Sequence, residues 1–336
     1  MKVTVGIKAL NEEGHIAASL GSAVEAVRPF QGEVILADSG STDRTIEIAR
    51  QFPVRIYQLA VPSERSCGTG AQLAFQHADG EFFYLLDGDM ILDPAFLPAG
   101  IAFLEGNSDF AAVGGRIHEV NTDTEEYRIR ADVAKADSNW RPGTVDRLDC
   151  GGLYRASSLK EVGYLADRNL HAFEEFELGA RLREKGWKLA RIDVPAVEHY
   201  GHTTGSFRLL WRRLKSGYAA AHGEVLRGAI GRPHLPLVVR NLGHIRNSAA
   251  VIVWWAALLV LAFLYPLVAL ALLLLPLLFL VVRRKSFRLG LYSFTMWNVY
   301  AWGLLEGLFK PRVPPDQKIA SVELAGSVPD KVSASR

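Results

Sequence analysis

The sequence predicts an α/β fold in which a mostly parallel sheet is flanked by helices and followed by C-terminal membrane-associated helices. Between residues 3 and 91, short apolar runs alternate four times with helical patterns. This alternation favours a parallel sheet with right-handed crossovers. Further along, residues 249–282 form a run of 34 side chains without a charge. As one helix, this run would exceed the ~30 Å core of a bilayer.

Polar side chains follow the expected strands of the first part. Lys8 to Glu12 follow the first strand, Asp38 follows the second, and Asp87 and Asp89 follow the fourth. Open α/β sheets bind ligands at the carboxyl ends of their strands, so a nucleotide lying across these ends explains the polar groups jointly. No G-x-G-x-x-G opens the first helix, and no P-loop occurs. The strands are expected at residues 3–7, 34–37, 54–59 and 82–86, and the helices at 11–27, about 44–49 and 65–77.

The stretch Tyr84–Asp89 organises this part of the chain. Its apolar run ends in two carboxylates, Asp87 and Asp89, separated by one glycine. Two carboxylates this close repel each other unless a cation lies between them, and oxygen ligands favour Mg²⁺ or Mn²⁺. The alternative is an ordinary acidic turn, because Asp-Gly is a common turn dipeptide.

The pattern is less regular between residues 94 and 205. Gly151 and Gly152 indicate a backbone that turns or closely approaches a ligand. Glu174 and Glu175 begin a helix, where carboxylates either take part in chemistry or only complement the helix dipole. We expect a helix at 95–104, strands at 110–120 and 188–194, and a polar helix at 124–137.

Charge is unevenly distributed along the chain. The formal net charge is +2, but residues 240–312 hold eight Lys or Arg and one acid, Glu306. This split indicates a slightly acidic body joined to a basic, apolar membrane region, and it argues against nucleic acid as a partner. Cys67 and Cys150 are too few for a disulfide framework, so we expect reduced thiols. The N-terminus enters a strand pattern without an apolar signal region, so we expect the first element in the cytosol.

The C-terminal third is expected to associate with a membrane. Residues 206–240 are expected to form a basic amphipathic connecting helix, which either lies on an anionic membrane surface or packs on the enzyme body. Tyr265-Pro266 divides residues 249–282 into halves of 17, the lower limit for spanning. Basic residues flank both ends, which favours a transmembrane helical hairpin that returns to the cytosol. Residues 289–309 are expected to form an interfacial or third membrane helix, and residues 311–336 a disordered tail.

With these motifs assembled, about the first 210 residues resemble glycosyltransferase family 2, which is built on the Rossmann-like GT-A fold. The stretch Val3–Glu12 is similar to the family's opening strand and Asn-Glu turn, with Lys8 where proline is usual and Leu10 where an aromatic residue is common. Asp38–Asp43 resembles its Asp-x-x-Ser-x-Asp turn, whose first acid holds the nucleotide base or ribose. Asp87-Gly88-Asp89 resembles its D-x-D motif.

The resemblance implies roles for the matching side chains. It implies that Asp89 binds a divalent metal, Mg²⁺ or Mn²⁺, that bridges the diphosphate, and that Asp87 contacts the ribose or a metal-bound water. Glu174-Glu175 resembles the Glu-Asp pair of E-D-x-D-L, so Glu175 is expected to be the catalytic base, with Glu174 next in line. The residues expected to bind the donor are Ala9, Leu10, Glu12, Asp38, Arg65 and Asp87, with Gly151 and Gly152 in the acceptor-side wall.

A histidine-containing segment completes the resemblance. His199-Tyr200-Gly201-His202 looks like the segment that supplies a further metal ligand in some GT-A enzymes. We favour His202 as this ligand, with His199 as the substitute. A structural histidine is the alternative for either one.

The expected protein is an inverting, metal-dependent glycosyltransferase at the cytosolic face of the inner membrane. It moves a sugar from a nucleotide-diphospho-sugar to a hydroxyl group of a lipid-linked or polysaccharide acceptor, such as an intermediate of exopolysaccharide synthesis. The catalytic domain is expected at residues 1–205, with the donor half at about 1–93 and the acceptor half at about 94–205. The alternatives are a processive polysaccharide synthase of the same family, a nucleotidyltransferase, and an inactive membrane-tethered sugar-nucleotide-binding protein. Against the synthase, Trp211-Arg212-Arg213 departs from the Q-x-x-R-W motif.

Overall fold

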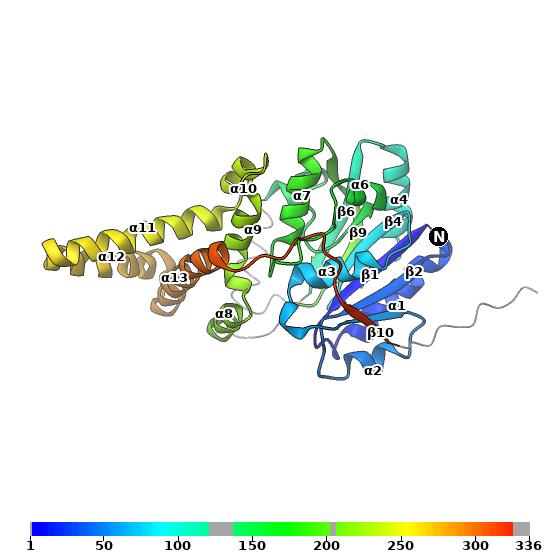
Figure 1. Ribbon diagram of the computed structural model, residues 1–336, viewed down its shortest axis with the longest axis horizontal. Helices are drawn as coiled ribbons and strands as arrows, with labels where there is room; N and C mark the ends of the chain where they lie inside the picture. The colour runs from blue at the N-terminus through cyan, green and yellow to red at the C-terminus, as the bar shows by residue number, and fades with distance from the viewer. Residues whose placement is uncertain (1, 121–136, 202–205, 325–336) are drawn as a thin grey trace, which may run out of the picture. The chain divides into compact units, whose positions relative to one another are not determined.

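The computed structural model describes residues 2–120, 137–201 and 206–324 (Figure 1). These residues divide into two compact units. The first holds the described residues up to 170, together with 174–201 and 313–324, and the second holds residues 171–173 and 206–312. The expected polar helix at 124–137 lies outside the described residues, apart from Asp137.

The first unit is built on a sheet with the strand order β10-β3-β2-β1-β4-β8-β6-β9-β5, and β7 pairs with β9. Strands β3, β2, β1 and β4 are parallel, as the alternation of strand and helix predicts. In the other half β6 and β9 pair in parallel, whereas β8, β5 and β7 pair antiparallel. The sheet is therefore mixed, because the alternation that predicts parallel pairing ends near residue 94. The strands are β1 Val3–Ala9, β2 Glu33–Asp38, β3 Arg55–Leu59, β4 Phe82–Asp87, β5 Met90–Leu92, β6 Phe110–Glu119, β7 Gly143–Val145, β8 Gly152–Arg155, β9 Lys188–His199 and β10 Ser321–Leu324.

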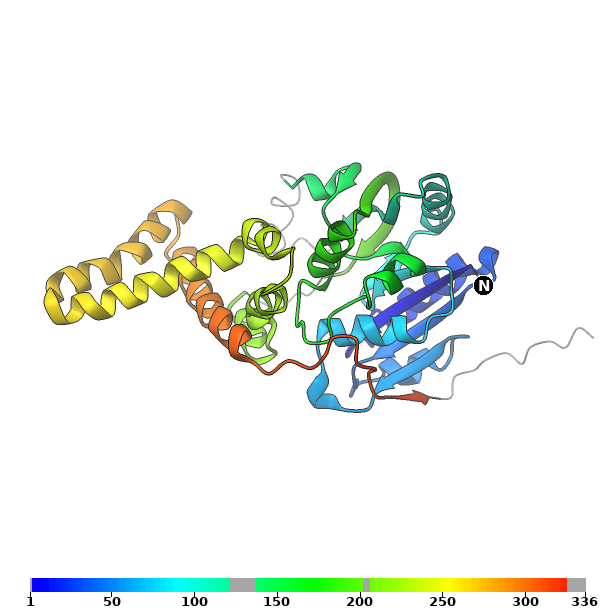
Figure 2. The same ribbon diagram turned by 45° about the horizontal axis from the view of Figure 1, so that its top comes forward.

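Helices cover both faces of this sheet (Figures 1 and 2). Successive side chains of a strand point to opposite faces, so Tyr84 of β4 joins one buried cluster and Phe83 joins the other. Helices α1, α2 and α4 contribute to the first cluster, and α3, α6 and α7 to the second. The helices are α1 Ile16–Val27, α2 Thr45–Ala49, α3 Cys67–Gln76, α4 Phe96–Gly106, α6 Ala156–Glu161 and α7 Glu174–Glu184.

The segment after residue 312 is ordered up to residue 324, so the expected disordered tail is wrong for this part. Strand β10 pairs antiparallel with the edge strand β3, and Ile319 is buried. The Gln76 side chain binds the Ile319 backbone twice, donating to its carbonyl oxygen at 2.9 Å and accepting from its N–H at 3.0 Å. An added edge strand is held mainly by backbone hydrogen bonds, which leave little periodic signal in a sequence.

The second unit is helical. Helix α13 packs along α9, α11 and α12. Its Gly303 and Gly307 allow a close approach to the backbone of Ala219 and Ala220, where an added Cβ would overlap. The helices are α8 Ser206–Lys215, α9 Ala221–Ala229, α10 Leu235–Asn241, α11 Gly243–Leu264, α12 Pro266–Arg284 and α13 Phe287–Phe309.

The expected connecting helix at 206–240 is not continuous, and α8, α9 and α10 occupy this range instead. Gly217 ends α8 with a left-handed φ of +81°, and Gly231, with a φ of +77°, follows α9. Glycine adopts this conformation without steric cost and commonly ends helices. The apolar spacing of residues 207–226 persists across these breaks, which is why the sequence pattern resembles one long helix.

Helices α11 and α12 are long and apolar enough to cross a membrane, and no other described helix is. The chain breaks between them at Tyr265, and Pro266 lies in the first turn of α12, as the sequence predicts. Their large apolar side chains are mostly exposed, with Phe263 at 83% and Leu267 at 82%. The core helix of a soluble protein buries such side chains, so these two helices differ from that class.

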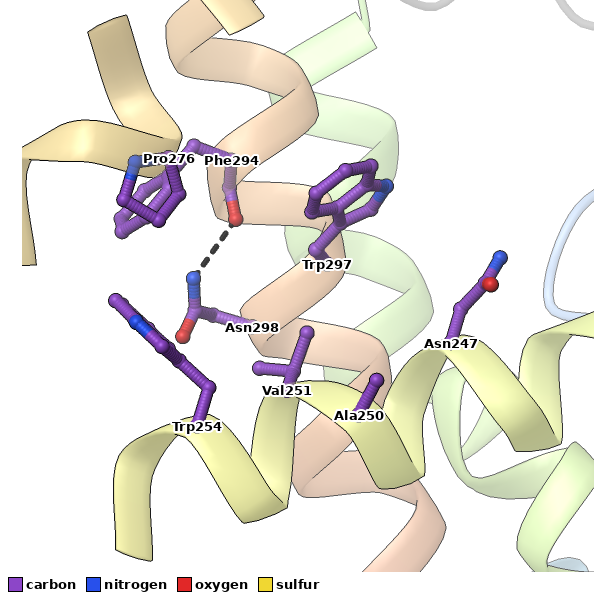
Figure 3. Close-up of a pocket in the computed structure, with 8 residues that line it drawn as sticks. All are labelled: Asn247, Ala250, Val251, Trp254, Pro276, Phe294, Trp297 and Asn298. Atoms are coloured by element: carbon purple, nitrogen blue, oxygen red, sulfur yellow. Dashed lines mark hydrogen bonds between the residues drawn. The ribbon is translucent and has the colours of Figure 1, made fainter. Parts of the chain in front are cut away.

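A cavity of about 270 Å³ lies between α11, α12 and α13 (Figure 3). The Asn298 amide belongs to its wall. The nitrogen of that amide donates to the Phe294 carbonyl oxygen at 2.9 Å, and its oxygen accepts from Nε1 of Trp255 at 2.6 Å. The lining residues are Asn247, Ala250, Val251 and Trp254 of α11, Pro276 of α12, and Phe294, Trp297 and Asn298 of α13.

Candidate active site

The carboxyl ends of β1, β2 and β4 meet at one edge of the sheet because these strands are parallel neighbours. Ala9 is in register with Asp38, and Lys8 is in register with Asp87. Between Asp87 and Asp89, Gly88 fits closely, since an added Cβ would lie 3.1 Å from Cβ of Ala9 and 3.0 Å from Cγ of Glu12. Strand register therefore brings together polar side chains that are far apart in the sequence.

Asp38 shapes the turn that follows β2. Its side chain is fully buried. Its Oδ2 accepts from the backbone N–H groups of Gly40 at 2.8 Å and Ser41 at 2.9 Å, and from Nε2 of Gln58 at 2.9 Å. The Ser41 hydroxyl donates to Oδ1. Asp38 thus holds the backbone after β2 in one conformation.

The segments after β1 and β3 contact the turn after β2 at the same edge of the sheet. Oδ1 of Asn11 accepts from the Thr42 N–H at 2.7 Å, which joins the turn after β1 to the turn after β2. Arg65 donates to the carbonyl oxygens of Ser39 at 2.8 Å and Gly40 at 3.2 Å. The residues Ala9, Leu10, Glu12 and Arg65, all expected at the donor site, lie on or next to these turns.

A cation, Lys8, lies among the acidic side chains. Its Nζ is 2.5 Å from Oε1 of Glu174 and 3.2 Å from Oδ1 of Asp87. Burial lowers the pKa of Lys8, but the carboxylates of Asp87, Glu174 and Glu175 outweigh burial and raise this pKa well above its ordinary value. Burial likewise raises the pKa of Asp87, and the charge of Lys8 opposes that shift. Lys8 therefore stays charged and compensates part of the acidic cluster.

Three carboxylates begin helix α7, at Glu174, Glu175 and Glu177. Glu177 forms an ion pair with Arg181 at 2.7 Å within the helix. Burial, followed by the charge of Glu174, raises the pKa of Glu175 to about 8. A carboxyl group with a pKa near the working pH is suited to accept a proton in a reaction.

His199 faces Asp89 on one side and Glu119 on the other. Its Nε2 lies 3.5 Å from Oδ2 of Asp89, and its Nδ1 lies 2.7 Å from Oε2 of Glu119. Burial lowers the pKa of His199, but hydrogen bonds to Asp89 and Glu119 outweigh burial and raise it to about 9. Histidine ligands usually have their second ring nitrogen held by a carboxylate, and oxygen and imidazole donors suit Mn²⁺ or Mg²⁺. The arrangement fits a divalent metal on the Asp89 side of the ring.

Cys150 lies close to the same histidine. Ligand atoms of Glu119, Cys150 and His199 all lie within 4.8 Å of one another. Gly151 follows with a left-handed φ of +90°, and an added Cβ there would lie 2.6 Å from the Leu85 carbonyl oxygen. Gly152 is in register with Leu85 in the β4–β8 pair. The two glycines thus pack against β4 just before the D-x-D acids.

Sequence reasoning did not assign a role to Lys8, Glu119 or Cys150. The signal at Lys8 was a basic residue at the end of a buried strand, where the family pattern has proline. Glu119 ends β6 and carries no motif of its own. His202, the favoured metal ligand, lies outside the described residues, whereas its substitute His199 lies beside Asp89.

A mixed sheet that gathers acidic side chains at the carboxyl ends of its parallel strands is the architecture of GT-A glycosyltransferases. The mannosyltransferase PcManGT of Pyrobaculum calidifontis, solved in complex with GDP-Man and Mn²⁺, has this fold. It is 18% identical with a TM-score of 0.64, over 92% of this chain and 87% of that one, and at this identity the likeness shows the fold alone. Residues 4–163 match the family described as Glycosyl transferase family 2. This match covers just under half of the chain, and together with the fold it supports a family 2 glycosyltransferase.

Two curated relatives show how far the similarity extends. The dolichol-phosphate mannosyltransferase of Pyrococcus furiosus is 28% identical over 120 residues, which cover 34% of this chain and 33% of that protein. The succinoglycan biosynthesis protein ExoA of Rhizobium meliloti is 24% identical over 263 residues, which cover 75% of this chain and 78% of that protein. The chain thus spans a third of the length of the mannosyltransferase, and it spans 58% of a further curated relative.

Proposed function

We propose that this protein is an inverting, metal-dependent glycosyltransferase that moves a sugar from a nucleotide-diphospho-sugar to a hydroxyl group of a lipid-linked or polysaccharide acceptor. The observation that carries the proposal is the convergence of Asp38, Asp87 and Asp89 at one sheet edge, with Glu174 tied to Asp87 through Lys8. This arrangement supplies acidic side chains for a metal and a nucleotide. The buried carboxyl group of Glu174 lies next to them.

The donor lies across the carboxyl ends of β1, β2 and β4 in this proposal. Asp38 and its turn would bind the nucleoside, and Asp87 would accept a hydrogen bond from the ribose. The complex of PcManGT with GDP-Man and Mn²⁺ supports a nucleotide-sugar as the donor class.

Asp89 and Nε2 of His199 would hold the metal, and Glu119 would keep the His199 ring in place from the opposite side. When bound, the divalent ion stabilises the negative charge that develops on the leaving nucleoside diphosphate. A diphosphate stabilised in this way would leave without a proton, so the site would need a base and no general acid.

Glu175 acts as that base. Its carboxylate takes the proton of the acceptor hydroxyl while the acceptor oxygen attacks the anomeric carbon from the face opposite the diphosphate. The bond from the anomeric carbon to the acceptor forms, the bond to the diphosphate breaks, and the configuration inverts. Glu174 is less suited to this role because Lys8 already engages its carboxylate at 2.5 Å.

The acceptor is lipid-linked or a growing polysaccharide, and the catalytic unit works at the cytosolic face of the inner membrane. The exposed apolar surfaces of α11 and α12 support insertion in a bilayer. Arg246 near the start of α11 and Arg283 and Arg284 at the end of α12 support a hairpin with both ends in the cytosol. The apolar cavity between α11, α12 and α13 supports a lipid as part of the acceptor.

A donor screen tests the proposal on the full-length protein in detergent. We expect one nucleotide-sugar to raise the unfolding temperature when Mn²⁺ is present, because a ligand that binds only the folded state stabilises it. With that donor and a membrane extract, NMR of the product should show the anomeric configuration opposite to that of the donor. No stabilisation by any nucleotide-sugar, or a product of retained configuration, would contradict the proposal.

A further inference from the structure

Lys8 makes the contacts that join the donor side of the site to the helix that carries Glu175. It is the penultimate residue of β1, and its side chain is 14% exposed. Its Nζ contacts Glu174, the first residue of α7, at 2.5 Å and Asp87, the last residue of β4, at 3.2 Å. A single ammonium group therefore connects helix α7 to β1 and β4, two strands that already pair with each other.

The surrounding packing leaves room for this side chain. Gly70 of α3 lies over β1, and a Cβ added at Gly70 would be 3.2 Å from Cβ of Lys8 and 4.0 Å from its Cδ. The glycine thus permits α3 to approach the stem of Lys8 closely. A shorter side chain at position 8 could not reach Glu174 along this path.

Lys8 supplies the positive charge next to a group of carboxylates around Glu175. Besides Lys8, the charged groups that act on Glu175 are Glu174 of α7, Asp87 of β4 and Asp149 in the segment before β8. Two further titratable groups, Cys67 of α3 and Tyr154 of β8, also interact with Glu175. Buried carboxylates repel one another and lose hydration unless a cation compensates them. Among the groups that act on Glu175, Lys8 is the cation.

We propose that Lys8 is a positioning residue that holds Glu174 and Asp87 in one arrangement, so that the start of α7 presents Glu175 to the acceptor beside the donor diphosphate. This inference rests on the proposed function, in which Glu175 is the base and Asp87 binds the donor. Lys8 stands where the family pattern has proline, and a proline side chain carries no ammonium group to make these contacts.

The test compares two substitutions at position 8 in the full-length protein. Lys8→Met keeps most of the apolar stem but removes the charge, whereas Lys8→Arg keeps the charge. Lys2→Met is the matched control, because Lys2 lies one residue before β1 and makes a largely exposed ion pair with Glu105 at 2.6 Å. We expect Lys8→Met to lower kcat at pH 7 roughly 10²-fold, as a misplaced reacting group does.

The pH profile separates positioning from a merely structural role. Without the Lys8 charge, the carboxyl groups around Glu175 hold their protons more tightly, so the pH of half-maximal rate should move upward. Lys8→Arg should restore part of the rate and part of the profile, and Lys2→Met should match the wild type. A Lys8→Met enzyme with wild-type kcat and profile would overturn the proposal. So would a loss that is equal at every pH and that Lys8→Arg does not reduce.

A double substitution checks that Lys8 acts through Glu174. We expect Lys8→Met combined with Glu174→Gln to lose no more activity than the more damaging single change, because both remove the same contact. Losses that multiply would show that the two residues act independently, which contradicts the proposal.

Thermal unfolding gives a readout that does not need activity. In Lys8→Met, the folded state should bind more protons than the unfolded chain over a wider pH range, so its unfolding temperature should fall more steeply from pH 6 to pH 9 than that of the wild type or Lys2→Met. If the wild type transfers no sugar from any donor, the proposed function fails, and this comparison still decides the role of Lys8. If the unfolding temperatures of Lys8→Met and the wild type changed equally with pH, the proposed role of Lys8 would be overturned.

Discussion

Nε2 of His199 lies 3.5 Å from Oδ2 of Asp89, where Met90 of β5 pairs with His199 at the end of β9. His199, the last residue of β9, thus lies beside Asp89, which directly precedes β5. The proposed metal site at Asp89 and His199 therefore depends on the register of the β5–β9 pair. A one-residue slip of that register would turn His199 to the opposite face.

We expect Asp89→Ala or His199→Ala to lower donor turnover about 10²–10³-fold, because each removes support for charge on the leaving group. Isothermal titration with Mn²⁺ should show weaker binding in both variants. His118→Ala is the matched control, since His118 is exposed and lies on β6 next to Glu119. Full turnover in the presence of a chelator would remove the metal from the mechanism.

Glu119→Gln should have a milder effect than loss of His199. Glu119 holds Nδ1 of His199 at 2.7 Å, and loss of such a partner typically costs 10–100-fold in metal affinity or activity. The measurement is Mn²⁺ affinity at fixed pH. An affinity equal to that of the wild type would show that the His199 ring is held by other contacts.

Glu175→Gln should abolish transfer but leave donor binding largely intact. Loss of a general base typically costs about 10²–10⁴-fold in rate, whereas in the proposed site other side chains bind the nucleotide. Turnover and the donor-dependent rise in unfolding temperature check the two parts separately. Glu184→Gln, at the exposed end of the same helix, is the control. Full activity of Glu175→Gln would move the base elsewhere, with Glu174 next in line.

The rate of transfer should rise with pH up to about 8. The pKa of Glu175 is raised to about 8 by burial and then by Glu174, so at lower pH the group carries a proton and cannot accept another. Below this pKa, each unit of pH should cost up to about tenfold in rate. The check is kcat measured from pH 6 to pH 9 with saturating donor and metal, and a flat profile would argue against Glu175 as the base.

Ile319→Ala should destabilise the catalytic unit although it lies far from the site in sequence. Ile319 is 1% exposed, and emptying a buried isoleucine site typically costs about 2–5 kcal/mol. Val322→Ala is the control, because Val322 lies on β10 and is 52% exposed. Chemical unfolding should separate the two variants clearly. Equal stability of the two variants would mean that burial of Ile319 does not support the fold.

Leu275→Lys should weaken membrane association. Leu275 lies at the middle of α12 and is 57% exposed, so in a bilayer its charged replacement would face lipid at a cost of up to about 3.5 kcal/mol. The share of protein that resists carbonate extraction should fall, while Trp211→Lys, at an exposed position on α8, should change it less. An unchanged share in Leu275→Lys would argue against insertion of α12 in a bilayer.

The sequence by itself determined the elements that deliver acidic side chains. Apolar strands that end in Asp38 and Asp87, a helix that starts at Glu174 and a break at Tyr265-Pro266 are properties of short segments. Local periodicity and the chemistry of the terminal residues carry that information. For the same reason, the parallel half of the sheet was predictable from the alternation of strand and helix.

Only the tertiary structure decided which distant side chains meet. Lys8 and Glu174 are separated by 166 positions and His199 and Glu119 by 80, and β10 joins β3 across most of the chain. No local pattern marks these partners, because strand pairing and helix packing choose them. The Asp87-Gly88-Asp89 motif is readable from one segment, whereas its countercharge and its neighbouring histidine come from strands that only the folded sheet places beside it.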